Sequence, residues 1–158
     1  MEKFCQDRVV IITGAGGGLG AAHARVLASH GAKVVINDIN ASAAEQVVKD
    51  ILSSGGEAVY NCANITDFAD SKRSVEQAIS EFGALHAVVN NAGNNRDRMF
   101  ASLSEEDWDA VISVHLKGHF CTARHAVEYW RELAKKGEGL AARIVNTTSG
   151  AGLQGSVG

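Results

Sequence analysis

A glycine-rich stretch at residues 14–20 has the composition and position of a phosphate-binding turn. It follows four β-branched residues, Val9–Ile12, which are typical of a strand buried in a parallel sheet, and it precedes a helix-forming segment at 21–28. Glycines let the backbone approach a pyrophosphate closely, and the N-terminus of a helix offers N–H groups and positive dipole to it. Strand, glycine turn and helix together indicate a dinucleotide site, and a flexible loop is the alternative.

The spacing of the glycines narrows the kind of site. It fits T-G-x-x-x-G-x-G, as Thr13-Gly14 followed by Gly18-Leu19-Gly20, whereas a G-x-G-x-x-G pattern begun at Gly14 would place its last glycine on Leu19. No Lys-Ser or Lys-Thr pair follows the glycines, which excludes a P-loop.

Asp38 is the acidic residue that such a site needs. It ends an apolar segment at 33–38 that reads as a second strand, and it lies 18 residues beyond Gly20. A carboxylate in this position accepts hydrogen bonds from the ribose hydroxyls and repels a 2′-phosphate. No Arg or Lys stands beside it or in the glycine turn, so we expect NAD rather than NADP as the cofactor. The alternative for Asp38 is a turn residue.

Length and composition set the class of protein. The 158 residues suit one domain, 1–158, and a hydrophobic content of 46% with 21% charged residues is ordinary for a globular protein. A net charge of −3 argues against binding to nucleic acid or to a membrane surface. The start, Met1–Asp7, is too polar for a signal peptide, and no apolar run has transmembrane length. Three scattered cysteines predict reduced thiols and a cytoplasmic protein.

Strand and helix patterns alternate along the rest of the chain. We expect strands at 57–62, 85–90 and 143–148, and helices at 41–54, 67–81 and, as one long helix, 104–134. Capping boxes at Ser42-x-x-Glu45 and Ser104-x-x-Asp107 open the first and last of these helices. Such alternation predicts a parallel sheet covered by helices on both faces. No helix is expected in the glycine-rich segment 149–158, which leaves the fifth strand uncovered, so we expect a continuing natural chain or a covering partner.

These motifs resemble those of the short-chain dehydrogenase/reductase family. The glycine turn and Asp38 are followed by Asn90-Asn91-Ala92-Gly93 after the fourth strand and by Ile144-Val145-Asn146-x-x-Ser149 at the fifth. The resemblance covers essentially the whole chain. It implies an α/β Rossmann-type sheet with strand order 3-2-1-4-5, and a cofactor that lies across the switch between strands 1 and 4.

The resemblance also implies which residues bind the cofactor. The pyrophosphate would be lined by Gly14, Gly18 and Leu19, the ribose by Asp38, the adenine by Asn64 and Ile65, and the rest of the cofactor by Asn90, Ala92 and Gly93. Asn64 stands where the family often has Asp, and its amide can also bond the exocyclic amine of the base. Asn91 is expected to tie the central strands together. The alternatives are turn formation for Asn90 and Asn91, and capping of the next segment for Asn64.

Two residues match the reaction machinery of the family. Ser149 matches the serine that bonds the substrate oxygen, and its alternative is a turn residue or helix cap. His115 stands in the long helix where the family usually has an asparagine that bonds a backbone carbonyl and supports a proton relay, and one imidazole nitrogen can do similar work.

His115, Arg96-Asp97-Arg98 and Glu106–Asp109 resemble the (3R)-hydroxyacyl-CoA dehydrogenase domain of peroxisomal multifunctional enzymes, which implies a secondary alcohol or ketone substrate such as a CoA thioester. The Arg-Asp pair also resembles ketoacyl carrier-protein reductases, which generally use NADPH, and Asp38 favours the former. Arg96 and Arg98 are candidates to contact an anionic acyl carrier, or else are solvated loop charges.

The family's Tyr-x-x-x-Lys motif is not found in these 158 residues. The tyrosines are Tyr60 and Tyr129, and neither has a lysine four residues later. Tyr is the expected proton donor, and Lys lowers its pKa and holds the nicotinamide ribose. We therefore expect this chain to bind NAD without meaningful turnover. The alternative function is a non-enzymatic, truncated NAD-binding or assembly module.

Two further patterns concern metals and partners. His115 and His119 lie one helical turn apart, but position 116 is leucine rather than the glutamate of H-E-x-x-H, so no metal site is expected. The family pairs long helices across subunits, which implies a homodimer or homotetramer. The apolar face of the long helix is a candidate interface, and core packing explains the same pattern; its residues are Val111, Leu116, Phe120, Val127 and Trp130.

Overall fold

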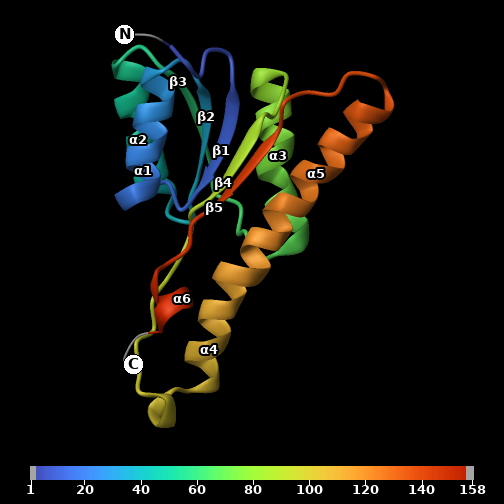
Figure 1. The fold of residues 1–158 in the computed structure, drawn as a ribbon. Helices are drawn as coiled ribbons and strands as arrows, with labels where there is room; N and C mark the ends of the chain where they lie inside the picture. Colours follow the sequence, from blue (N-terminus) through green and yellow to red (C-terminus); the bar gives the residue numbers. More distant parts are fainter. Residues whose placement is uncertain (1–2, 156–158) are drawn as a thin grey trace.

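A computed structural model describes residues 3–155, so Met1, Glu2 and residues 156–158 of the glycine-rich segment lie outside the described part. Five parallel strands form one sheet in the order β3-β2-β1-β4-β5, as predicted (Figure 1). The strands are β1 (Val9–Thr13), β2 (Lys33–Asn37), β3 (Glu57–Asn61), β4 (Ala87–Asn90) and β5 (Arg143–Asn146). Four strands are shorter than expected at one end, β2 and β3 by one residue and β4 and β5 by two.

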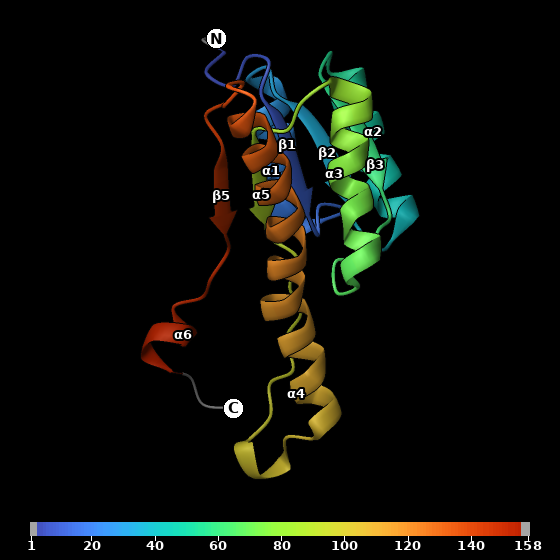
Figure 2. The ribbon, with the colours of Figure 1, turned by 90° about the vertical axis from the view of Figure 1, so that its right-hand side faces the viewer.

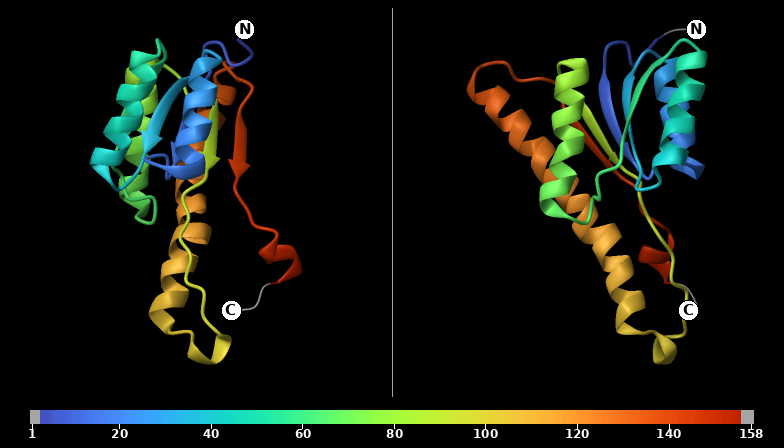
Figure 3. Two further views of the ribbon diagram at one scale, coloured as in Figure 1. Left: turned by 90° about the vertical axis from the view of Figure 1, so that its left-hand side faces the viewer. Right: turned by 180° about the vertical axis from the view of Figure 1, so that it is seen from behind.

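Helices cover both faces of the sheet (Figures 1 and 3). The helices α1 (Gly18–Ser29) and α2 (Ala41–Ser53) lie on one face, while α3 (Phe68–Phe82) and α5 (His119–Lys135) lie on the other. All five residues of β1 are buried, because this central strand is packed on both sides. Its alternating side chains enter two apolar clusters, one with Ile12 beneath α1 and α2 and one with Ile11 beneath α3 and α5.

The long helix predicted at 104–134 is continuous in its path but not uniformly α-helical. It consists of α4 (Glu105–Ile112), a π-helical turn η2 (Ser113–Gly118) and α5. Ser104 caps α4 as predicted, since its hydroxyl accepts from Asp107 N at 3.1 Å. The helix α4 and the short 3₁₀ turn η1 (Phe100–Ser102) extend beyond the carboxyl ends of the strands (Figure 2).

Two local predictions were wrong. The capping residue of α2 is Asn40 rather than Ser42: Asn40 Oδ1 accepts from Ala43 N at 3.2 Å, and the Ser42 hydroxyl only donates to that same oxygen. A short helix, α6 (Ala151–Gln154), follows β5 where none was expected. Within residues 3–155, no helix combines the length and the apolar character needed to cross a membrane.

The capping of α2 gives a stability prediction. Asn40→Ala removes the acceptor for an N-terminal N–H group and is expected to lower the free energy of unfolding by about 1 kcal/mol. Ser42→Ala is the matched control and should lower it by roughly a few tenths, because its hydroxyl bonds no backbone donor of the helix. Urea denaturation of both variants measures the difference, and equal losses would contradict the assignment of Asn40 as the cap.

Candidate functional site

The glycine turn and Asp38 meet at the carboxyl ends of β1 and β2. Gly16 N donates to Asp38 Oδ2 at 2.9 Å, and Asn40 N donates to Asp38 Oδ1 at 2.9 Å. A Cβ on Gly16 would lie 2.9 Å from Asp38 Oδ2, so only glycine allows this approach. Backbone donors thus fix both carboxylate oxygens, and each oxygen keeps a lone pair for a ligand hydroxyl.

The glycine turn, residues 14–20, and Asp38 together form what we call the glycine corner. The end of β4 is joined to this corner. Thr13 Oγ1 accepts from Asn91 N and Ala92 N, both at 3.0 Å, and Asn91 Nδ2 donates to Thr13 O at 3.1 Å. Gly14 has a φ of +62°, and a Cβ there would lie 2.7 Å from Ala92 Cα. Asn91 therefore ties β1 to β4, and the missing side chain of Gly14 lets the two strand ends approach.

These strand ends border a cavity of about 640 Å³. It brings together most of the residues predicted to bind a cofactor, and also His115. Those predicted residues are Gly14, Leu19, Asp38, Asn64, Ile65, Ala92, Gly93 and His115. Further lining residues that sequence reasoning missed are Asn37, Asn94 and Thr147, although each lies next to a recognised motif or strand end. Gly18 is the first residue of α1, with a φ of +52°, and adjoins the lining residues Gly17 and Leu19.

Asn90 differs from this set. Its side chain is fully buried, and its Nδ2 donates to Asn146 Oδ1 at 2.8 Å across to β5. It is not among the residues that line the cavity, and its part in flanking the cofactor stays a prediction. Asn90 is the last residue of β4, whereas Asn91 lies beyond the strand, where its side chain donates to Thr13 O.

His115 lies on the π-helical turn and contacts the loop after β4. Its Nε2 lies 3.0 Å from Asn94 N and 2.8 Å from Asn94 O, so one tautomer accepts from the amide and the other donates to the carbonyl. A Cβ on Gly93 would lie 2.6 Å from His115 Cε1, which means that the ring packs directly on this glycine. π-helical turns are often found at functional sites, where they change which side chains face a neighbouring loop.

A second cavity, of about 660 Å³, shares His115 and Ala92 with the first and adds Ser149 and His119. The two predicted reaction residues, His115 and Ser149, therefore face one space. Ser149 Oγ also accepts from Ala151 N at 3.2 Å, so the alternative role of this residue at a helix start is present as well. Accepting that bond leaves the hydroxyl proton of Ser149 to be donated to a ligand oxygen.

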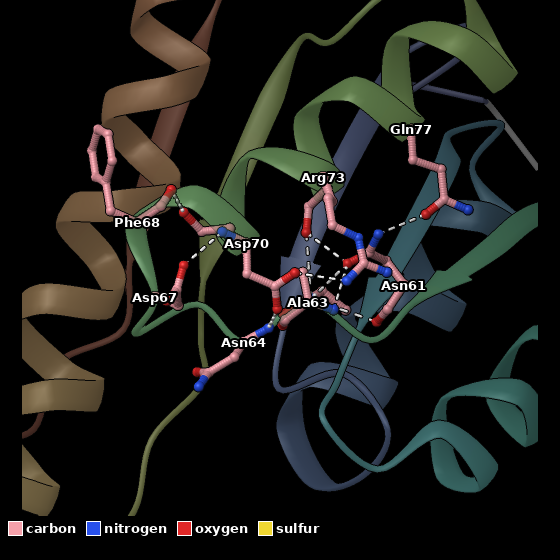
Figure 4. A network of polar contacts seen from close by, with 11 residues as sticks. Asn61, Ala63, Asn64, Asp67, Phe68, Asp70, Arg73 and Gln77 are labelled. Atoms are coloured by element: carbon pink, nitrogen blue, oxygen red, sulfur yellow. Dashed lines mark hydrogen bonds and ion pairs between the residues drawn. The ribbon is translucent and has the colours of Figure 1, made fainter.

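The loop after β3, which borders the first cavity, is held by polar contacts with α3 (Figure 4). Asp70 Oδ2 accepts from Asn64 N at 2.6 Å, and Asp70 Oδ1 pairs with Arg73 at 2.6 Å. The Asn64 backbone bond and the Arg73 guanidinium hold the pKa of Asp70 below its usual value. Asn61 Oδ1 accepts from Ala63 N at 2.9 Å, which fixes the start of the loop.

Arg96 and Arg98 form ion pairs with one carboxylate. Their Nε atoms lie 3.7 and 3.5 Å from the oxygens of Asp107, at the N-terminal end of α4. This arrangement supports the reading of both arginines as loop charges. Among residues 3–155, no group of three or more His, Cys, Asp or Glu side chains is placed to hold a metal ion.

Comparison with known proteins identifies the family to which this chain belongs. A family model described as short chain dehydrogenase matches residues 8–158. The chain belongs to the short-chain dehydrogenase family. It is 46% identical to a hydroxyacyl-CoA dehydrogenase of Mycobacterium tuberculosis, covering 96% of this chain and 50% of that protein. It is 42% identical to the peroxisomal multifunctional enzyme type 2 of Mus musculus, over 96% of this chain and 20% of that protein.

A solved structure supports the same family assignment. A crystal structure of a short chain dehydrogenase from Mycobacterium avium matches with a TM-score of 0.94 and 52% identity, over 98% of this chain and 56% of that one. These relatives confirm the resemblance to hydroxyacyl-CoA dehydrogenases. The chain spans about half the length of the two mycobacterial proteins and less of the multifunctional enzyme.

His119 gives a pH prediction. Burial lowers its pKa from the usual 6.5, the contact with Ala92 O opposes this, and His115 lowers it further. Since the pKa of the folded state is the lower one, the unfolded chain binds more protons below about pH 6.5. The stability contributed by neutral His119 is therefore complete above that pH and is lost as the pH falls through the folded-state pKa.

NMR titration of the imidazole signals should give a midpoint below 6.5 for His119. His119→Gln should flatten the pH dependence of the unfolding free energy between about pH 7 and 5, and His23→Gln, at an exposed position on α1, controls for the loss of an imidazole. A midpoint of His119 at or above 6.5 would contradict the effect of burial.

Proposed function

We propose that this chain is the NAD-binding part of a dehydrogenase that oxidises or reduces a secondary alcohol or ketone, with a 3-hydroxyacyl-CoA thioester as the substrate class. The observation that carries the proposal is Asp38, whose carboxylate is fixed at the glycine corner with a lone pair on each oxygen. The thioester class is supported by the similarity to relatives named hydroxyacyl-CoA dehydrogenase.

The residues at the corner fit a dinucleotide. Side chains are excluded at Gly14 and Gly16, which leaves backbone and the N-terminus of α1 beside the cavity for a pyrophosphate. Asp38 accepts from ribose hydroxyls and repels a 2′-phosphate, which supports NAD over NADP. Ile39 and Ile65 line the cavity beyond Asp38 and offer apolar surface to a base. Bound nicotinamide supplies a hydride acceptor or donor.

The protein residues orient the substrate and carry protons. Ser149 donates its hydroxyl proton to the substrate oxygen and stabilises charge that develops there. His115 is held between the Asn94 backbone and Gly93 and connects the two cavities, so it supports proton movement toward solvent. A tyrosine and a lysine supplied by further sequence would complete proton transfer, and we propose that the 158 residues alone bind NAD without turnover.

The alternative to an enzyme is a binding or assembly module, which would use the same cofactor site but catalyse no reaction. For assembly, we propose a homodimer or homotetramer in which the helix face bearing Leu116, Phe120 and Val127 is covered, because these side chains are 65%, 57% and 46% exposed. Trp130 belongs to the core instead, since its Nε1 donates to Leu85 O at 2.7 Å. Three free cysteines support a reducing, cytoplasmic setting.

Cofactor preference tests the proposal. Asp38→Asn removes the charge and one acceptor, and it should weaken NADH binding about ten-fold while NADPH binding improves or stays the same, because hydrogen bonds to a charged group are worth more than neutral ones. Fluorescence titration of NADH and NADPH measures both. Asp109→Asn, an exposed carboxylate on α4 outside the cavity, should change neither. Absence of NADH binding to the unchanged chain would contradict NAD use, and equal affinity for both cofactors would contradict the preference for NAD over NADP.

Turnover separates enzyme from module. Incubated with NAD and a 3-hydroxyacyl-CoA, the 158-residue chain should bind the cofactor and form no NADH, whereas a longer chain that adds Tyr-x-x-x-Lys should form it. Absorbance at the NADH band reports the reaction. NADH formation by the 158 residues would contradict the assigned need for that motif, and inactivity of the longer chain would favour the module.

A further inference from the structure

The side chain of Asn94 fastens the loop after β4 to the long helix. Asn94 Nδ2 donates to Ala110 O, in the last turn of α4, at 3.0 Å. A carbonyl can only accept, so the atom that faces Ala110 is the NH₂ group and the two ends of this amide cannot be exchanged. The bond therefore holds the loop just ahead of the π-helical turn η2, which carries His115.

The other end of the same amide is buried without compensation. Asn94 Oδ1 is buried and has no hydrogen-bond partner within residues 3–155. A buried oxygen without a donor lowers the stability of a fold, and an apolar side chain of similar size would avoid that loss. The net contribution of this side chain to stability is therefore small, and its main effect is on the geometry of the loop.

The backbone of Asn94 meets one nitrogen of His115 with two groups of opposite kind. Its N–H lies 3.0 Å and its carbonyl oxygen 2.8 Å from His115 Nε2. A bare Nε2 accepts from the N–H group, and a protonated Nε2 donates to the carbonyl, so this nitrogen has a partner in either state. An imidazolium can therefore release a proton to solvent from Nδ1 or from Nε2, and the neutral ring that remains is still held by Asn94.

Few other titratable groups surround this imidazole. His119 faces it from α5, with 6.3 Å between the ring centroids, and the loop residues 91–95 that pack against it carry no charge. Lys117, on the same π-helical turn, is exposed. Apart from the two histidines, Asp38 is the single titratable side chain among the described residues that line the two cavities.

We propose that Asn94 is a positioning residue for His115. Its side-chain bond to Ala110 O keeps its backbone N–H and carbonyl at Nε2, so the imidazole gains or loses a proton without rotating. The use of this arrangement for proton movement in the reaction rests on the proposed function, whereas the placement of the ring requires no bound cofactor.

The position of the imidazole can be measured by NMR. A Cβ on Gly93 would lie 2.6 Å from His115 Cε1, so the unchanged chain should show a nuclear Overhauser signal between His115 Hε1 and the Hα protons of Gly93. The signal should persist at about pH 8 and at about pH 5, which bracket the titration of an ordinary imidazole. Loss of the signal at the lower pH in the folded chain would overturn the inference that the ring keeps its place when protonated.

A pair of variants tests the bond to the helix. Asn94→Asp keeps the shape of the side chain but cannot donate to Ala110 O, and it should abolish the signal between His115 and Gly93. Asn95→Asp adds the same charge to the same loop, at a side chain that donates to Asp97 rather than to the helix, and it should leave the signal intact. Loss of the signal in both variants, or in neither, would overturn the proposal.

A third variant separates positioning from folding. Asn94→Leu removes the donor together with the unpaired oxygen, so the unfolding temperature should stay at or above that of the unchanged chain while the signal is lost. A signal that persists in Asn94→Leu would contradict a positioning role, and a lowered unfolding temperature would show that the side chain serves the fold instead. Absence of NADH binding would overturn the proposed function and leave these outcomes unaffected.

Discussion

The hydrogen bond from Gly16 N to Asp38 Oδ2, at 2.9 Å, is the contact on which the rest of the site depends. It joins the turn after β1 to the end of β2, and it requires glycine at position 16 because a Cβ would collide with the carboxylate. The carboxylate is thereby held at the edge of the cavity rather than in the solvent. A second bond, from Asn40 N, makes the orientation unique and couples it to the start of α2.

The same principle of backbone donors and small residues extends across the sheet. Thr13 receives two backbone N–H groups from the loop after β4, and Gly14 makes room for Ala92. Farther on, Gly93 makes room for the ring of His115, which the π-helical turn directs at this loop. Part of the cavity lining thus consists of positions at which a side chain is absent or is engaged by the backbone, while Ile39, Ile65 and Val114 add apolar surface, which suits a ligand that carries both polar groups and an apolar ring.

Much of the fold and of the candidate site could be predicted, because period and spacing encode them directly. The buried strand Val9–Thr13 and the glycine turn are local patterns, and the 3-2-1-4-5 order follows from the family resemblance. What could not be predicted depends on contacts between distant residues. Asn90 and Asn91 are chemically identical, and their contacts differ because β4 ends between them: Asn90 pairs with Asn146 of β5, and Asn91 donates to Thr13 O. The π-helical turn within the long helix has no residue type that marks it in the sequence. Asn40 and Ser42 are both favoured capping residues, and only the position at which α2 begins shows that Asn40 is the cap.

The most direct measurement is NMR titration of the ¹⁵N-labelled chain with NAD. We expect the amide signals of Gly16 and Asp38 to shift together with increasing NAD, along with those of residues 17–19, because ribose and pyrophosphate bind at one corner. Signals of the opposite end of the sheet, such as Gly55, should stay in place, since Gly55 does not line this cavity. Shifts confined to other residues, with the Gly16 and Asp38 signals unmoved at saturating NAD, would contradict binding of the cofactor where the glycine turn meets Asp38.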